Sequence, residues 1–187
     1  MRMCSRDEIL TLISTGKLVA QAPENDELVF LDEHRIGLHM DRLYEVSGTV
    51  HLDRPDSADL REVSMETEEL TPQVLYLGVT RESFLLHGDL AATLHTRSTY
   101  ARLGLELLGS SNVVVPGFGS TRAAPLIFEI SVKQPTSGFR PDKAYCFMLL
   151  YQLHAPRRSP NRAPYWRRFP LQTDVTNGSP AGEHKTL

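Results

Sequence analysis

Cysteine is scarce in this sequence: only Cys4 and Cys146 occur among 187 residues, and they lie far apart in the chain. Two such cysteines supply no disulfide framework and no C-x-x-C pair of the kind that binds zinc. We expect both thiols to behave as small apolar side chains in a reducing cytoplasm. A chain of this length buries roughly two thirds of its unfolded surface, so a stabilising crosslink is not required.

Long apolar runs and an excess of positive charge are also missing. No apolar stretch approaches the roughly 20 residues that span a bilayer, and the first ten residues, MRMCSRDEIL, are charged where a signal peptide would be apolar. We therefore expect a soluble, cytoplasmic protein without a membrane partner. The formal net charge of -3 gives no general attraction to polyanions, which argues against duplex nucleic acid as a partner.

The pattern of apolar residues predicts one short helix followed by many short strands. Ser5 is suited to cap a helix that carries Asp7 and Glu8 in its first turn and ends at Gly16. The later apolar runs, among them RIGLHM, VLYLGVT, LAATLHT, PLIFEISV and KAYCFMLLYQL, are bounded by turn residues. This arrangement predicts a mainly β barrel or sandwich, and the acidic segment 53–71 is expected to be a surface excursion.

A change in composition divides the chain into residues 1–154, expected to form one β domain, and a C-terminal arm, residues 155–187. The arm begins with PRRSPNRAPYWRRFP, which is rich in arginine and proline. Such a segment cannot bury enough apolar surface to fold by itself. We expect it to be partly disordered unless an anionic ligand orders it.

The stretch 96–129 carries the candidate chemistry. Two guanidinium groups and two hydroxyls fall within six residues at the end of a predicted strand, on Arg97, Ser98, Thr99 and Arg102. Guanidinium groups match phosphate oxygens in pairs, and hydroxyls supply further donors. The cluster fits a phosphate site, although surface turns of the same composition also occur without a ligand.

Two further features follow in the same stretch. Pro116, Gly117 and Gly119 predict a tight turn that lets the backbone approach a ligand closely. Glu129 lies in the apolar strand LIFEISV. It either points outward, as strand alternation favours, or points inward as a proton carrier with a raised pKa.

The run Arg97-Ser-Thr-Tyr-Ala-Arg-Leu-Gly-Leu resembles the R-S-S-x-A-R-x-G-L signature of the dCTP deaminases, in the deaminase and dUTPase superfamily. In the same order along the chain, MRMCSRDEILTLISTGKL resembles the family's M-x-L-x-D-x-D-I start and LYLGVTRESF its F-x-L-A-x-T-x-E strand. VPGFGS followed by LIFEI resembles D-P-G-F-x-G with a following L-E, and YWRRFPLQ resembles the C-terminal Y…K-Y-x-x-Q lid. The similarity covers nearly the whole chain.

This resemblance implies a distorted β-barrel of the dUTPase-like type and a homotrimer whose active sites lie at subunit interfaces. Each site would bind a nucleoside triphosphate that carries Mg²⁺, without protein side chains as metal ligands. Glu129 would be the general base that activates water for attack at C4 of cytosine. Phosphate contacts, and help in positioning the water, would come from Arg97, Ser98, Thr99 and Arg102, and the lid would contribute Tyr165, Arg168 and Gln172.

Three departures from the family fall in the expected pocket. Val115 replaces an aspartate, Ser111 lies in a segment GSSNVV that replaces H-x-x-A-x-x-I-D, and the loop before Glu129 is longer and includes Arg122. Since valine accepts no hydrogen bond, pyrophosphate release from dUTP is disfavoured. The H-x-E and P-C-x-x-C motifs of zinc deaminases do not occur in the sequence.

The sequence therefore predicts hydrolytic deamination of a cytosine nucleotide without zinc, most simply dCTP to dUTP plus ammonia. The alternative is a non-catalytic or regulatory nucleotide-binding trimer of the same fold.

Overall fold

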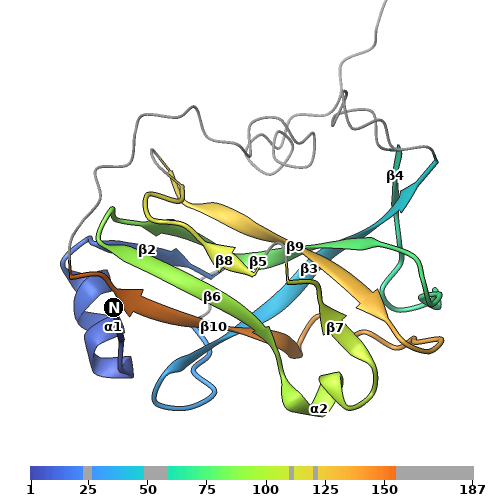
Figure 1. Cartoon of the computed structure of the whole chain (residues 1–187), viewed down its shortest axis with the longest axis horizontal. Coiled ribbons are helices and arrows are strands. Elements are labelled where there is room, and N and C mark those ends of the chain that lie inside the picture. Colours follow the sequence, from blue (N-terminus) through green and yellow to red (C-terminus); the bar gives the residue numbers. More distant parts are fainter. Residues whose placement is uncertain (23–26, 49–58, 110–111, 120–121, 155–187) are drawn as a thin grey trace, which may run out of the picture.

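The computed structural model describes residues 1–22, 27–48, 59–109, 112–119 and 122–154. Strands dominate this part of the chain, and both of its helices are short (Figure 1). In chain order the elements are β1 (Arg2–Met3), α1 (Arg6–Ser14), β2 (Leu18–Gln21), β3 (Arg35–Ser47), β4 (Asp59–Glu62), β5 (Tyr76–Leu86), β6 (Leu90–Thr96), α2 (Ser98–Ala101), β7 (Leu105–Leu107), β8 (Val113–Val114), β9 (Ala124–Val132) and β10 (Ala144–Gln152).

The strands form one curled sheet with the order β7-β9-β5-β3-β10-β6-β8. β1 adds to β10, β2 to β5 and β4 to β3, and every pairing is antiparallel. In Figure 1, α1 lies at the left of the sheet and α2 at its lower edge, beside β7. The predicted mainly β fold, a distorted barrel with a short N-terminal helix, is confirmed.

The N-terminal helix forms where its sequence predicts it. Ser5 Oγ accepts a hydrogen bond from the Glu8 amide at 3.4 Å, and Glu8 Oε2 accepts one from the Ser5 amide at 2.9 Å. This capping box satisfies amides that an α helix leaves without intrahelical partners. Ile9 and Leu12 then anchor the helix in the core.

The core lies on the inner face of the curled sheet, because alternate residues of each strand point inward. Along β9, for example, Leu126, Phe128, Ile130 and Val132 are buried while the residues between them are partly exposed. Both cysteines are buried and free. Burial raises the pKa of the Cys146 thiol to about 12, so this thiol stays protonated and packs as an apolar group.

The acidic segment before β5 contains a strand. Within the predicted surface excursion 53–71, residues 59–62 form β4 against β3, and residues 53–58 lie outside the described part of the chain. Arg61 joins the strands by donating to Glu45 and Glu68, at 2.6 and 2.5 Å, and Val63 and Leu70 are buried in the core. The apolar residues after β4 thus hold an acidic stretch against the sheet.

Candidate functional site

The predicted phosphate cluster forms the turn between β6 and β7. β6 ends at Thr96, Arg97 is the N-cap of α2, and α2 is a single turn, Ser98–Ala101. Ser98, Thr99 and Arg102 are exposed, so their hydroxyls and guanidinium group are accessible to a ligand. The structure therefore brings three of the four predicted phosphate residues together on one open turn.

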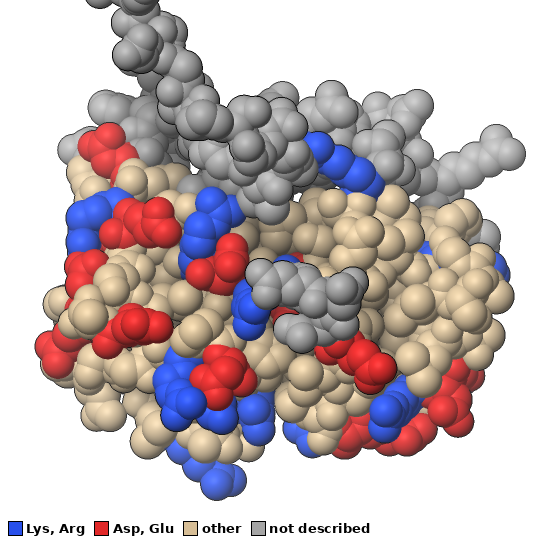
Figure 2. Space-filling view, turned by 180° about the vertical axis from the view of Figure 1, so that it is seen from behind, with Lys and Arg blue, Asp and Glu red and all other residues tan. Residues whose placement is uncertain are grey.

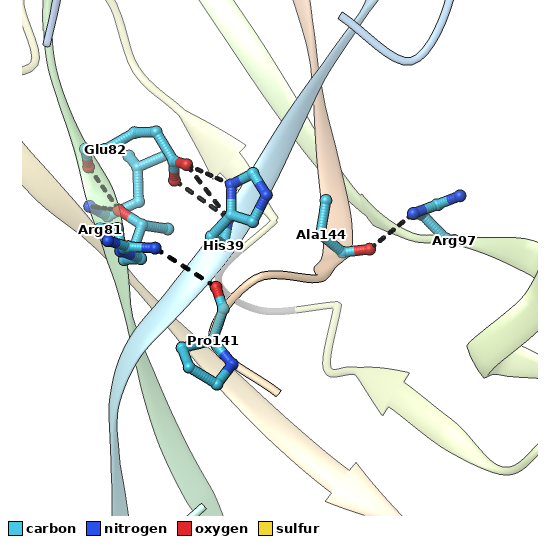
Figure 3. A network of polar contacts seen from close by, with 8 residues as sticks. His39, Arg81, Glu82, Arg97, Pro141 and Ala144 are labelled. Carbon is cyan, nitrogen blue, oxygen red and sulfur yellow. Dashed lines mark hydrogen bonds and ion pairs between the residues drawn. The ribbon is translucent and has the colours of Figure 1, made fainter. Parts of the chain in front are cut away.

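Arg97, the fourth predicted phosphate residue, is held by the body of the protein. Its Nη1 donates to the carbonyl of Ala144 at 2.9 Å (Figure 3), and its amide donates to the carbonyl of Tyr145 at 3.0 Å. The guanidinium carbon also lies 5.8 Å from the centre of the Tyr100 ring. Since a guanidinium has five N–H donors, the Ala144 contact leaves others for a ligand.

Aromatic side chains fix α2 against the segment that leads into β10. The Tyr145 ring lies 4.6 Å from the Tyr100 ring and 5.0 Å from the Phe139 ring, centre to centre. The Tyr145 hydroxyl accepts a hydrogen bond from the amide of Arg140, and burial raises the pKa of this hydroxyl. The turn that carries Ser98 and Arg102 is thus attached to packed side chains.

Glu129 lies on β9 and is partly exposed. Its neighbours Phe128 and Ile130 point into the core, so the Glu129 side chain lies on the outer face of the sheet. Its residue partner on β5 is Leu77. The outward orientation that strand alternation favours is the one observed, and the inward alternative is not.

Consecutive amides at the end of β7 connect the phosphate cluster with Glu129. The Leu107 amide donates to Thr96 Oγ1 at 3.0 Å, immediately before Arg97. The next amide, of Leu108, donates to the Glu129 carbonyl at 3.0 Å. The start of the exposed turn and the strand of the candidate base are therefore neighbours within one subunit.

The glycine turn packs closely against β5. Gly119 has φ +85°, and a Cβ there would lie 2.8 Å from the carbonyl oxygens of Phe84 and Arg122. The Leu86 amide donates to the Phe118 carbonyl at 2.9 Å. The close approach that this glycine permits is to β5 of the same chain.

The remaining predicted pocket residues separate into two groups. Val115 is 58% exposed and next to the buried Val114, while the Arg122 amide donates to the Gly119 carbonyl at 2.9 Å. Val115 and Arg122 thus flank the glycine turn. Outside the described residues lie Ser111, Tyr165, Arg168 and Gln172, together with the rest of the arm.

Sequence reasoning missed a buried acidic group, Glu82 on β5. It is 4% exposed, and its Oε1 lies 2.7 Å from Nδ1 of His39 on β3. The available signal was the final glutamate of the F-x-L-A-x-T-x-E pattern that LYLGVTRESF resembles, which falls on Glu82. Glu82 is buried, whereas Glu129 is partly exposed.

Charges of both signs are interspersed on the molecular surface. Figure 2 shows Lys and Arg next to Asp and Glu over the face opposite to that of Figure 1. Near α2, Asp142 pairs with Arg140 at 3.0 Å and with Lys143 at 3.1 Å. Among the described residues, no three His, Cys, Asp or Glu side chains are grouped so as to hold a metal ion, and no helix has the length and apolarity to cross a membrane.

Comparisons with known proteins agree with this architecture. A family model described as dCTP deaminase-like matches residues 3–153. The chain is 32% identical over 132 residues to a dCTP deaminase of Marinomonas sp. (strain MWYL1), a match that covers 63% of this chain and 68% of that protein. It is 29% identical over 125 residues to a dUMP-forming dCTP deaminase of Dictyoglomus turgidum (strain DSM 6724 / Z-1310), covering 63% and 62%.

A solved structure shows the same fold. The crystal structure of 2'-deoxycytidine 5'-triphosphate deaminase from Agrobacterium tumefaciens superposes with a TM-score of 0.61 at 19% sequence identity. The superposition covers 82% of this chain and 49% of that one. The chain thus spans about half the length of that protein, and the predicted fold type is confirmed.

Proposed function

The chain belongs to the dCTP deaminase-like family, and from this premise we propose that it deaminates a cytosine nucleotide by hydrolysis, most simply dCTP to dUTP plus ammonia. One observation carries the proposal beyond the family: the consecutive amides of Leu107 and Leu108, at the end of β7, bond to Thr96, directly before the exposed turn, and to the Glu129 carbonyl. A phosphate cradle and a carboxylate are thereby supplied by adjacent rigid elements.

Glu129 acts as the general base in this proposal. Its carboxylate takes a proton from water as the oxygen attacks C4 of the cytosine ring, and the proton then passes to the leaving ammonia. The position of Glu129 within the paired strand β9 fixes the backbone that carries the carboxylate. On the same outer face, Ile127 packs against Tyr44, Leu77 and Val79, which provides an apolar boundary for the reacting base.

The triphosphate is held by the exposed turn. Ser98, Thr99 and Arg102 offer hydroxyls and a guanidinium group to the phosphate oxygens, and Arg97 offers the donors that Ala144 does not use. Tyr165, Arg168 and Gln172, which lie outside the described residues, are proposed to contribute the lid contacts that the family resemblance implies. The triphosphate would carry Mg²⁺ into the site, where the ion would neutralise part of the phosphate charge.

The active unit is a homotrimer with sites between subunits. Glu129 lies on the outer face of the sheet, so a base that reaches it is enclosed only when a second surface covers that face. Val113 and Val115, 61% and 58% exposed, are apolar side chains of the kind that a neighbouring subunit covers. We place this trimer in the cytoplasm.

Val115 shapes the choice of reaction. Its side chain has no acceptor for a sugar hydroxyl or for the water that attacks a phosphate. Deamination, which depends on Glu129, is therefore retained, and pyrophosphate release from dUTP is not supported.

A substrate panel read by mass spectrometry tests the proposal. Wild-type protein is incubated with dCTP, CTP, dCMP and dUTP in the presence of Mg²⁺, and the release of ammonia or pyrophosphate from each nucleotide is followed. Turnover of a cytosine nucleotide is expected, and Glu129→Gln should reduce kcat by about 100-fold or more, as loss of a general base does. Saturable binding without turnover would instead favour a regulatory trimer, and full activity of Glu129→Gln would contradict the assigned base.

A further inference from the structure

Three strands of the sheet, β3, β5 and β10, have shifts in their pairing register near the buried residue Glu82. β3 passes there from its pairing with β10 to its pairing with β5. The three shifts lie between Ala144 and Cys146 on β10, Met40 and Arg42 on β3, and Val79 and Ser83 on β5. Such bulges interrupt the backbone ladder, redirect side chains and are frequent beside active sites.

Glu82 occupies this point. The His39 amide lies 3.3 and 3.1 Å from its two carboxylate oxygens, and His39 Nδ1 lies 2.7 Å from Oε1. The Thr80 hydroxyl donates to the Glu82 carbonyl at 2.6 Å. A buried carboxylate is tolerated only when it is hydrogen-bonded, so these contacts fix both Glu82 and the backbone of His39.

His39 connects this buried group to the candidate site. Its partner on β10 is Ala144, whose carbonyl accepts the hydrogen bond from Arg97 Nη1 at 2.9 Å. Figure 3 shows the hydrogen bonds between Glu82 and His39 and, separately, the one between Ala144 and Arg97; the pairing of β3 with β10 places His39 opposite Ala144. Arg97 is the residue immediately before α2.

We propose that Glu82 and His39 are positioning residues for phosphate binding: they fix the Ala144 carbonyl, which orients the Arg97 guanidinium toward the triphosphate. Two-point recognition of phosphate requires a fixed guanidinium plane, and Ala144 supplies the point that fixes it. The inference rests on the proposed function for the identity of the ligand. It concerns binding, so it is measurable without turnover.

Binding measurements separate this role from a merely structural one. Titration calorimetry compares wild type with Glu82→Ala, Glu82→Gln and His39→Ala, using magnesium tripolyphosphate, dCTP and deoxycytidine as ligands. Glu82→Ala and His39→Ala should weaken the binding of tripolyphosphate and of dCTP about tenfold, the effect of losing one charged hydrogen bond. The affinity for deoxycytidine should be unchanged. Glu82→Gln keeps an acceptor for the His39 amide and should recover part of the affinity.

Ser5→Ala is the matched control. It removes the N-cap of α1, which lies at the left of Figure 1, away from α2. It should lower the Tm and leave the affinity for tripolyphosphate unchanged. All variants are compared below their unfolding transitions. If Glu82→Ala does not fold, His39→Ala still carries the test: it keeps the amide contact that satisfies the buried carboxylate and removes the ring contact at 2.7 Å.

Three results would overturn the inference: equal tripolyphosphate affinity in wild type and both alanine variants, a parallel loss for deoxycytidine and tripolyphosphate, or absence of tripolyphosphate binding by wild type. Failure of the proposed function looks different. Wild type would then bind dCTP without converting it, while the affinity differences among the variants would persist.

Discussion

A methyl group added at Gly119 should destabilise the fold through two separable effects. The residue has φ +85°, and a Cβ would lie 2.8 Å from the carbonyl oxygens of Phe84 and Arg122 and 3.0 Å from the Leu85 Cα. All three atoms belong to the backbone, so a rotamer change cannot relieve the contacts. Gly119→Ala therefore combines an unfavourable dihedral with a collision against β5.

Two other glycines allow the effects to be measured apart. Gly138 also has a positive φ, +76°, but an added Cβ would meet nothing within 4 Å. At Gly109 the space is likewise open and φ lies outside the positive region. We expect Gly138→Ala to cost about 1 to 2 kcal/mol from the dihedral alone, and Gly109→Ala to be neutral within about 0.5 kcal/mol.

In Gly119→Ala the collision of the added Cβ with backbone atoms costs a further 1 to 3 kcal/mol, roughly. The free energy of unfolding should therefore fall by about 2 to 5 kcal/mol in total. Urea unfolding of wild type and the three variants measures the loss in free energy of unfolding, which should be largest for Gly119→Ala, smaller for Gly138→Ala and smallest for Gly109→Ala. In thermal melts, each kcal/mol corresponds to about 2 to 4 °C for a chain of this size. Equal losses for Gly119→Ala and Gly138→Ala would refute the assigned collision with β5.

Three further predictions concern a pocket, an ion pair and a thiol. Val115→Asp supplies an acceptor that the valine side chain lacks, so the KM for dCTP should fall relative to that for its 3'-deoxy analogue in steady-state assays. An unchanged ratio of the two KM values would remove Val115 from the sugar site. The side chain of Arg35 lowers the pKa of Asp32 from 3.8 to about 2, so the folded state is stabilised above pH 3.8 and loses this contribution as the pH falls through about 2. Asp32→Asn should therefore reduce the Tm at pH 5 and converge with wild type as the pH falls below about 2, and a difference of the same size at pH 5 and at pH 2 would contradict the linkage. Cys146, with its pKa raised to about 12 by burial, should react with a thiol reagent only at the rate of unfolding, measured by stopped-flow absorbance; rapid reaction in native buffer would contradict its burial.

Sequence patterns predicted the strands and the helix start that depend on interactions between near neighbours in the chain. Alternation identified the strand around Glu129, and Ser5 with Glu8 identified the start of α1, because side-chain period and capping depend on near neighbours. The clustering of Ser98, Thr99 and Arg102 also followed from their spacing in one short turn. The family resemblance supplied the fold type, which composition alone left open between barrel and sandwich.

Features that depend on strand register could not be predicted from the sequence. The contact of Arg97 with Ala144 joins residues 47 positions apart, and the contact of His39 with Glu82 joins residues 43 positions apart. Both arise where bulges shift the pairing, and a shift of one residue reverses which face a side chain occupies. The predicted roles of Glu129 and the lid stay predictions.

The position of β10 has a consequence for biosynthesis. This strand lies between β3 and β6 and also pairs with β1, although it is the last strand in the described chain. During translation, β3, β6 and β1 emerge from the ribosome before the strand that joins them. Long-range pairing of this kind slows folding, so we expect the nascent chain to keep an open gap in its sheet, and to need chaperone protection, until residues 144–152 have left the exit tunnel.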